Sequence, residues 1–278
     1  MSFFEAVILG LIQGLTEFLP ISSTAHLTIA GKFLGLINPT HPEEWTAFIA
    51  VIQLGTVAAV IVYFFRDLVQ IAKGFFADGP KYFKTKISGQ AKMGWFIILG
   101  TLPVALFGLS LKKIIEGNLT KSLAVIGTSM IGLALILWIA EIAGSRKKNM
   151  DNITWLDSLI IGIAQSFALI PGSSRSGTTI TAGLFLGIAR EDAARFSFLL
   201  SIPAVIASGF LELWEMRNFM GQVGVMNVII ATIVSFIVGY ASIAFLLKYL
   251  RTHTTYVFIW YRIVLGMFLW TLVLAHAG

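Results

Sequence analysis

The sequence predicts an all-α polytopic membrane protein: six transmembrane helices and two re-entrant helix-turn-helix hairpins, arranged as an inverted-topology repeat. Composition is the first observation, because 57% of the 278 residues are hydrophobic, only 12% are charged and the mean hydropathy is +0.86. Soluble domains carry about 25% charged residues. The second observation is a set of continuous apolar runs of about 20 residues, the length that a helix needs to cross a bilayer. The third is a pair of interrupted apolar segments that resemble each other.

Six apolar runs are long enough to span the membrane as helices. They lack the strict two-residue alternation of a transmembrane β-barrel, so helices are favoured. The predicted spans are residues 46–65, 93–111, 122–143, 194–212, 225–249 and 257–275. The formal charge of +6 does not indicate nucleic-acid binding, because Lys and Arg stand in the short loops between the runs. The chain has no cysteine, which excludes disulfides and thiolate metal sites.

Two further segments, 3–35 and 155–188, are apolar but are broken in the middle by Pro, Gly and a cluster of Ser and Thr. Each half is too short to cross a bilayer by itself. We therefore expect each segment to form a helix, a turn and a second helix that enters and leaves the membrane on one side. The first segment lacks the basic leader and cleavage site of a signal peptide, so we expect it to belong to the mature fold.

The two broken segments align with each other when one residue is dropped before the proline of the second. The identical pairs are Gly10 and Gly162, Gln13 and Gln165, Pro20 and Pro171, Ser22 and Ser173, Ser23 and Ser174, Gly31 and Gly183, and Gly35 and Gly187. This similarity predicts internal repeats of approximately 1–150 and 151–278 within a single integral membrane domain, 1–278. Each repeat holds one hairpin and three spans, an odd number, so the second is inverted and the two hairpin tips meet near the membrane midplane.

The distribution of positive charge predicts the orientation. In this topology thirteen Lys and Arg residues fall on one side and five on the other, while Arg175 and Arg262 lie within apolar segments. The positive-inside rule then places both termini and the mouth of the first hairpin on the outer face.

The polar residues at the two tips predict an anion site. In the first motif Gln13 and Glu17 stand four residues apart, on one helix face. After Pro20 the hydroxyls of Ser22, Ser23 and Thr24 open the next helix, with His26 in its first turn. A helix N-terminus offers unpaired backbone N–H groups to a phosphate.

The second motif repeats this arrangement and adds a guanidinium. Arg175 supplies the forked donors that bind phosphate oxygens, and Gly172 and Gly177 allow a close backbone approach. A carboxylate, an imidazole and several hydroxyls beside an anion cradle fit phosphoryl transfer, with His26 or Glu17 handling the proton.

Structural explanations are the alternative for these residues. Ser and Thr often only join membrane helices, Glu17 and Arg175 could form a structural ion pair, and His26 could only orient the loop. We expect Glu141, Glu212 and Arg262, near the predicted span ends, to reach toward the membrane surface.

The motifs QGLTEFLPISSTAH and PGSSRSGTT, in this order, resemble those of the undecaprenyl-diphosphate phosphatases of the bacitracin-resistance family, over the full length of the chain. The resemblance implies an enzyme of the bacterial cytoplasmic (inner) membrane. It would hydrolyse undecaprenyl (C55) diphosphate to undecaprenyl phosphate and inorganic phosphate, recycling the lipid carrier for peptidoglycan synthesis and conferring bacitracin resistance. It also implies a divalent cation, Mg or Ca.

Carried onto this sequence, the resemblance implies catalytic roles for Glu17, Ser23, His26 and Arg175. We expect the diphosphate to be bound by Ser22, Thr24, Gly172, Ser173, Ser174, Arg175, Ser176 and Thr178. Glu17 would hold the metal with Gln13, which stands where many members have Glu and cannot act as an acid or a base. Ser23 or a water would attack the phosphorus.

An alternative function stays open at this point. Inverted repeats with broken helices are also the architecture of transporters, so the alternative function is a polyprenyl-phosphate flippase or transporter.

The expected partners are the polyprenyl diphosphate lipid and the bilayer, with no nucleic acid. The small residues of 239–244 could serve internal packing or a homodimer.

Overall fold

The structure is a computed structural model, and it describes residues 1–78, 88–217 and 224–275. The described residues are helical apart from turns and one isolated β-bridge between Lys148 and Ile188. Six helices are long and apolar enough to span a membrane. They are α3 (Pro42–Tyr63), α5 (Gly89–Ser110), α7 (Leu123–Ala143), α10 (Arg190–Met216), α12 (Val225–Leu250) and α13 (Tyr256–Ala275). The predicted fold class, an all-α polytopic membrane protein, is confirmed.

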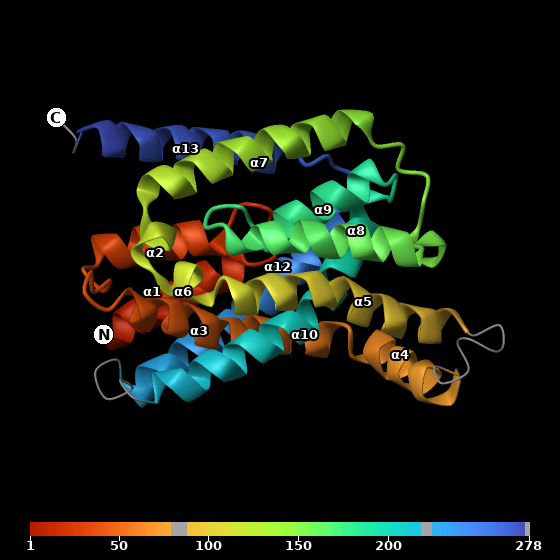
Figure 1. The fold of residues 1–278 in the computed structure, drawn as a ribbon, viewed down its shortest axis with the longest axis horizontal. Coiled ribbons are helices and arrows are strands. Elements are labelled where there is room, and N and C mark those ends of the chain that lie inside the picture. The colour runs from red at the N-terminus through yellow and green to blue at the C-terminus, as the bar shows by residue number, and fades with distance from the viewer. Residues whose placement is uncertain (79–87, 218–223, 276–278) are drawn as a thin grey trace.

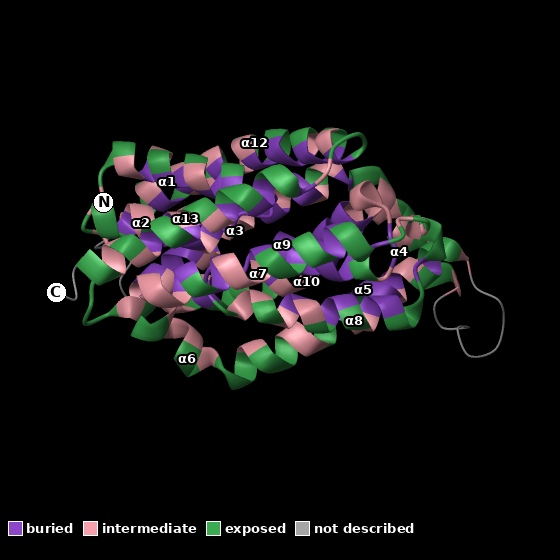
Figure 2. Ribbon diagram, turned by 90° about the horizontal axis from the view of Figure 1, so that it is seen from above, coloured by how far each residue is buried: buried purple, intermediate pink, exposed green. Residues whose placement is uncertain are grey.

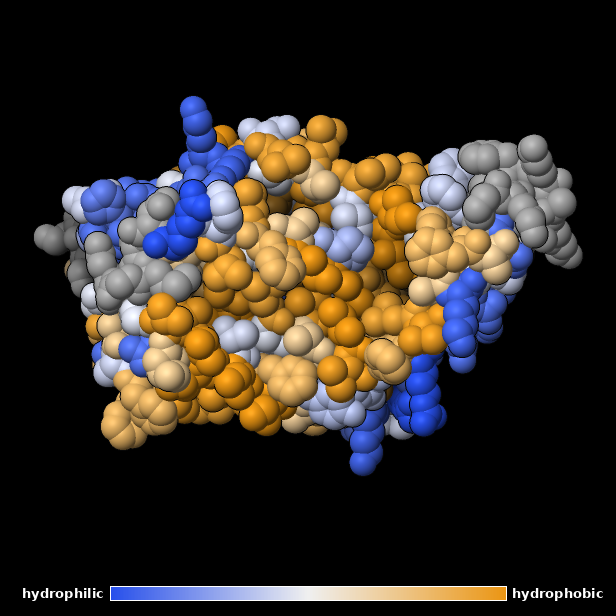
Figure 3. Space-filling view, turned by 90° about the horizontal axis from the view of Figure 1, so that it is seen from below, coloured by the Kyte–Doolittle hydropathy of each residue, from blue (hydrophilic) through white to orange (hydrophobic). Residues whose placement is uncertain are grey.

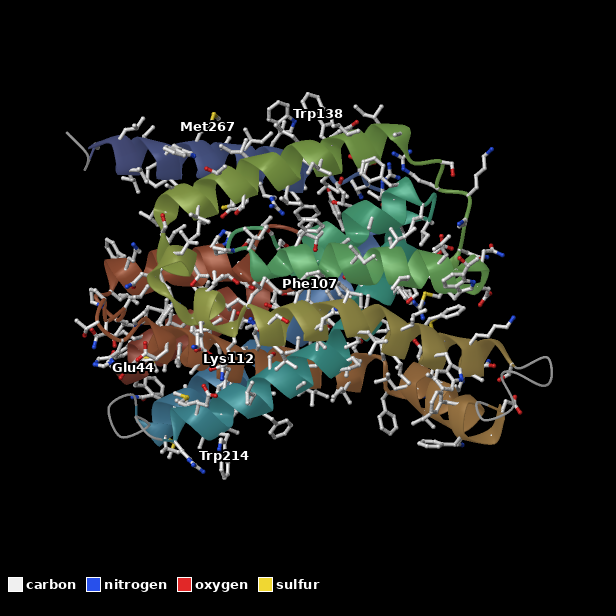
Figure 4. The ribbon with its side chains drawn as sticks, viewed as in Figure 1. Glu44, Phe107, Lys112, Trp138, Trp214 and Met267 are labelled. Atoms are coloured by element: carbon white, nitrogen blue, oxygen red, sulfur yellow. The ribbon has the colours of Figure 1, made fainter. Side chains whose placement is uncertain are left out.

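The surface suits a lipid environment. Figure 3 shows a broad apolar band between two hydrophilic ends. In Figure 2 the buried residues lie on the helix sides that face one another, and the exposed residues lie on the outward sides. Many outward residues are large and apolar, as Trp138 on α7 and Met267 on α13 illustrate in Figure 4. Because water would not tolerate so much exposed apolar surface, this band is the part that contacts lipid.

Each interrupted segment forms two short helices around a turn. The first contains α1 (Phe3–Thr16) and α2 (Ser23–Phe33). The second contains α8 (Trp155–Ser166), the 3₁₀ turn η4 (Phe167–Leu169) and α9 (Arg175–Phe185). At 1.5 Å per residue none of these helices spans the roughly 30 Å hydrocarbon layer. Their helix-turn-helix form agrees with the prediction, while their re-entrant path through a membrane stays a prediction.

The remaining elements are connections. Part of the expected long loop 66–92 forms a helix, α4 (Phe65–Asp78), that packs against α5, and the rest of that loop includes Lys81, Lys84 and Lys86, which lie outside the described residues. The short α6 (Lys112–Glu116) and η2 (Asn118–Lys121) join α5 to α7, and η3 (Met150–Asn152) precedes α8.

The helix contacts pair the two halves of the chain. α1 packs against α12, and α8, which holds the corresponding place in the second half, packs against α5. α3 packs against α10, and α7 against α13. If each helix is replaced by its counterpart in the other half, the same set of contacts results, which supports the predicted repeat. The bounds of the repeats at 1–150 and 151–278 stay predictions.

The turns of the two hairpins set the register between the halves. Ser22 and Ser174 have positive φ values of 75° and 70°, and their hydroxyls cap α2 and α9 by accepting from Ala25 N at 3.3 Å and Gly177 N at 3.1 Å. These serines are 152 residues apart (174 minus 22). The sequence alignment paired Ser22 with Ser173, so at this turn it is wrong by one residue. The residues that correspond are the two serines that cap the second helix of each hairpin, not the residues counted from the prolines. Ser23 therefore corresponds to Arg175, the first residue of α9.

Candidate active site at the two hairpin tips

Glu17, at the end of α1, joins the two hairpins. Its side chain is buried, and its Oε2 accepts from Ser23 Oγ at 2.6 Å and from Gln13 Nε2 at 2.9 Å. Its Oε1 is hydrogen-bonded and ion-paired with Arg175 Nη2. Three predicted site residues thus converge on the carboxylate of a fourth, and one of them, Arg175, comes from the second half of the chain.

A cavity of about 400 Å³ begins at these residues. Several predicted site residues line it: Glu17, Ser22, Ser23, Thr24, Gly172, Ser174 and Arg175. The rest of the wall is mostly apolar and comes from α3, α5 and α10. The lining extends to α6 and η2, at the end of the molecule where α1 begins and α13 ends. The cavity therefore has a polar floor and a mainly apolar wall, the form of a site for an amphipathic ligand.

Three of the predicted phosphate-binding hydroxyls do not line the cavity. Ser176 Oγ donates to Leu19 O at 3.1 Å, which ties α9 to the first tip, and Thr178 Oγ1 donates to Arg175 O at 2.9 Å. Ser173 is wholly buried, and its hydroxyl has no hydrogen-bond partner in the part of the chain that the structure describes. None of the three is among the residues that line the cavity. The structure thus does not bring these three hydroxyls to the cavity, because Ser176 and Thr178 bond to backbone carbonyls and Ser173 is buried in the turn before α9.

His26 is also directed away from Ser23. Its Nδ1 lies 2.7 Å from Ser22 O, and its Nε2 lies 2.6 Å from the hydroxyl of Tyr261, on which the imidazole stacks. Because a carbonyl oxygen only accepts, Nδ1 carries the proton in the neutral ring and Tyr261 donates to Nε2. His26 does not line the cavity among the described residues. The prediction that it takes the proton from Ser23 has no contact to support it.

Arg262 is a residue whose role the sequence did not indicate. The expectation that it reaches toward the membrane surface is wrong, because its side chain is fully buried. It donates to Pro20 O at 3.2 Å and to Gly172 O at 3.1 Å, one carbonyl from each hairpin tip. A third bond reaches Met130 O in α7 at 3.2 Å. Arg262 therefore fixes the two turns relative to each other. The sequence did hold one sign of its burial, since this arginine stands more than one helical turn inside an apolar run.

The other two residues expected near the surface are buried too. Glu141 accepts from the Thr255 hydroxyl at 2.8 Å and forms ion pairs with Arg146 and Arg190. Glu212 lies in the cavity wall.

Charged groups from α6, η2 and α10 lie at the far end of the cavity. Lys121 is buried and donates to Thr46 Oγ1 at 2.6 Å and to Glu116 O at 2.7 Å. Burial lowers the pKa of Lys121 to about 8, against the partial opposing effect of nearby carboxylates. Lys112, labelled in Figure 4, lies 3.4 Å from a carboxylate oxygen of Glu116 and is also paired with Glu215.

Two places offer oxygen ligands for a cation. At the tips the Glu17 carboxylate lies beside Gln13, whose Oε1 is buried and accepts no hydrogen bond from residues 1–78, 88–217 or 224–275. Both are ligands that Mg²⁺ and Ca²⁺ accept, and Mg²⁺ commonly takes one or two carboxylates together with substrate phosphates. The tip residues therefore fit a cation shared with a diphosphate. At the far end Glu116, Glu212 and Glu215 bring carboxylate oxygens within 4.8 Å of one another, and Lys112 is ion-paired with Glu116 and Glu215.

Comparison with known proteins shows the family. A sequence model of the bacitracin resistance protein BacA family matches residues 6–268. The chain belongs to this family. Relatives named undecaprenyl-diphosphatase include proteins of Syntrophobacter fumaroxidans, 56% identical over 99% of both chains, and of Chlorobium limicola, 53% identical over 96% of this chain and 95% of the relative. A Myxococcus xanthus protein of the same name is 50% identical over all of this chain and 91% of its own length. The hairpin-tip cluster is therefore a structural feature of a BacA-family chain.

Proposed function

We propose that this protein hydrolyses undecaprenyl diphosphate to undecaprenyl phosphate and inorganic phosphate at the two hairpin tips. The observation that carries the proposal is the Glu17 carboxylate, which accepts from the Ser23 hydroxyl and pairs with Arg175 beside a cavity with an apolar wall. The names of the relatives agree with this reaction. The product is the lipid carrier of cell-wall synthesis, and its recycling accounts for resistance to bacitracin.

The diphosphate binds at the ends of α2 and α9 that begin at Ser23 and Arg175. Backbone N–H groups at these helix N-termini and the Arg175 guanidinium are the donors that a phosphate requires. Ser174 and Thr24 line the same floor. The 55-carbon tail is apolar, so it lies along the apolar wall and continues into lipid.

Ser23 is the nucleophile in this proposal. Its Oγ–H points to Glu17 Oε2 at 2.6 Å, so the carboxylate accepts the proton as Oγ bonds to the terminal phosphorus. The bond from that phosphorus to the bridging oxygen breaks, and undecaprenyl phosphate leaves. Water then attacks the phosphoserine, the bond from phosphorus to Ser23 Oγ breaks, and Oγ takes back the proton that Glu17 holds. Inorganic phosphate leaves with the oxygen and hydrogens of the water, and Glu17 is again a carboxylate. Arg175 offsets the negative charge on the phosphoryl oxygens.

His26 holds the turn in this scheme. Its ring joins Ser22 O to Tyr261, so it keeps the residue before Ser23 in the positive-φ conformation that starts α2.

A divalent cation, Mg or Ca, is part of the proposal. Glu17 and the carbonyl oxygen of Gln13 would hold it together with phosphate oxygens, where it would neutralise part of the diphosphate charge.

The proposed orientation places both termini and the cavity mouth on the outer face of the bacterial cytoplasmic membrane. The support is the charge count of thirteen against five and the extension of the cavity toward the end where α1 begins. A homodimer stays a prediction.

The test is product analysis with purified protein in detergent. We expect C55 diphosphate plus Mg²⁺ to yield C55 monophosphate and inorganic phosphate, with much slower hydrolysis of inorganic pyrophosphate, which lacks a tail. A protein that binds the lipid without cleaving it would contradict the phosphatase and favour the flippase alternative, which none of these relatives' names supports.

Ser23→Ala separates the two forms of attack. The proposal requires loss of turnover and of any acid-stable phosphoprotein in this variant. Residual turnover at a substantial fraction of the wild-type rate would show that water attacks directly.

A further inference from the structure

The second hairpin carries a buried amide without partners. Gln165, near the end of α8, has no exposed surface, and neither its Nε2 nor its Oε1 has a hydrogen-bond partner among the described residues. An unsatisfied buried amide costs about 1–3 kcal/mol. Gln165 lies in the cavity wall, together with Gly172 and Arg175 of the same hairpin. A group that the fold leaves unpaired at a ligand cavity is a candidate for binding the ligand.

The first hairpin shows what such an amide does when an acceptor is present. Gln13, 152 residues before Gln165, donates its Nε2 to Glu17 Oε2 at 2.9 Å, four residues further along the chain. The residue four positions after Gln165 is Leu169, which has no acceptor in its side chain. The second hairpin thus keeps the amide donor but lacks the anionic oxygen that the first hairpin supplies.

We propose that Gln165 binds the substrate, donating its amide N–H to an oxygen of the diphosphate that takes the place of the missing carboxylate. This inference rests on the proposed function and adds a residue to its binding site. The charge fits, because a phosphate oxygen is an anionic acceptor as a carboxylate oxygen is. The side chain has three rotatable bonds, so the amide turns from the wall toward the headgroup when the cavity fills.

The position also accounts for an asymmetry between the hairpins. In the first hairpin the Glu17 carboxylate accepts hydrogen bonds from Gln13, Ser23 and Arg175. Among the described residues Gln165 has no acceptor of this kind, so in our proposal the substrate accepts its hydrogen bond. One hairpin then supplies the reacting groups and the other supplies donors to the diphosphate.

The experiment compares Gln165→Met, which keeps the side-chain length but removes donor and acceptor, with wild type in detergent. We expect the KM for C55 diphosphate to rise about 10-fold, the loss of one hydrogen bond to a charged group, with kcat changed less than about 3-fold. The midpoint of thermal unfolding without ligand should stay the same or rise, because the unsatisfied amide is gone. Gln13→Met, which removes the amide N–H that is hydrogen-bonded to Glu17, should lower that midpoint.

Controls keep the outcomes separate. Gln70→Met, on the exposed face of α4, should change neither KM nor the unfolding midpoint. Gln165→Glu is the second variant: its carboxylate repels the diphosphate, so its KM should exceed that of Gln165→Met.

An unchanged KM in Gln165→Met, or a drop in the unfolding midpoint like that of Gln13→Met, would overturn the inference and leave Gln165 as a packing residue. Absence of phosphate release from wild type would instead contradict the proposed function. In that case the rise in unfolding midpoint on adding C55 diphosphate still tests Gln165: a smaller rise in Gln165→Met supports its contact with the lipid, and an equal rise overturns it.

Discussion

Glu17 has two carboxylate oxygens, and both are engaged: one by Arg175, the other by Ser23 and Gln13. The guanidinium therefore has two tasks at the tips. It pairs with Glu17, and in the proposed function its remaining donors bind the diphosphate at the N-terminus of α9.

Arg175→Lys tests this geometry while keeping the charge. A lysine is a point charge without the forked donors, so it cannot hold Glu17 and a phosphate oxygen together. We expect kcat/KM for C55 diphosphate to fall about 100-fold or more, the scale of a lost bidentate contact in a transition state. Activity within a few-fold of wild type would contradict the assigned role, and Arg66→Lys, exposed on α4, is the control.

Lys121 makes stability depend on pH. Its pKa is about 8 in the folded protein and ordinarily 10.5. Between these values the unfolded chain binds a proton that the folded chain lacks, so this group's contribution to the free energy of unfolding rises with pH. The rise is at most about 1.4 kcal/mol per pH unit.

The measurement compares the unfolding midpoints of wild type and Lys121→Met in detergent at several pH values. The difference between the two midpoints, wild type minus variant, should increase from about pH 8 to about pH 10. A difference that is flat, or that moves the other way, would contradict a buried ammonium at this site.

The sequence predicted the members of the cluster better than their contacts. The four-residue spacing of Gln13 and Glu17 implied a shared helix face, and the hydrogen bond between them confirms it. The motif did not predict that Ser176 and Thr178 bond to backbone, because a run of hydroxyls states residue types but not which side of a tightly packed helix faces the cavity.

At the scale of elements, the two turns depend on one side chain of a third element. Arg262 on α13 donates to Pro20 O and Gly172 O, which occupy equivalent places in the two hairpins. These carbonyls lie where the chain leaves its first helix, so without a donor they would be buried and unsatisfied.

Arg262→Met should loosen both tips at once. Each orphaned carbonyl costs about 1–3 kcal/mol, so we expect a loss of roughly 3 kcal/mol in the free energy of unfolding and a lower kcat. Thermal unfolding and phosphate release check this, with Arg251→Met, whose exposed ion pair with Glu191 contributes little, as the control. A variant as stable and active as wild type would show that the tips hold their positions without α13.

Element boundaries were predictable where apolar length decided them. The span predicted at 225–249 is α12 (Val225–Leu250), because a helix in lipid must be apolar over its whole length. The hairpin register was not predictable to one residue. Proline and serine recur near both turns, and only the positive-φ caps at Ser22 and Ser174 show which serines correspond.

At the scale of the whole molecule, α7 separates two ends whose loops differ in charge. The orientation proposed here places the α6–η2 connection outside and the α7–α8 connection in the cytoplasm. Composition alone predicted the membrane environment. It did not predict the burial of Arg262 and Glu141, because hydropathy does not distinguish a residue near a lipid boundary from one enclosed by neighbouring helices.

Single introduced cysteines test this orientation cleanly, because the chain has none. Asn118→Cys and Lys147→Cys replace exposed residues on opposite sides of α7. In intact cells a membrane-impermeant maleimide should label the first and should label the second only after permeabilisation. The reverse pattern would invert the proposed topology and place the cavity mouth in the cytoplasm.

The most direct test of the central claim is the rate of inorganic phosphate release from C55 diphosphate by purified wild type, Glu17→Gln and Arg175→Ala, with Glu43→Gln, exposed at the start of α3, as the matched control. We predict rapid release by wild type and the control, and a decrease of about 100-fold or more in both tip variants, each shown to be folded by a cooperative unfolding transition, since Glu17 accepts the proton and Arg175 binds the phosphate. Well-folded tip variants that release phosphate at the wild-type rate would contradict an active site at the two hairpin tips.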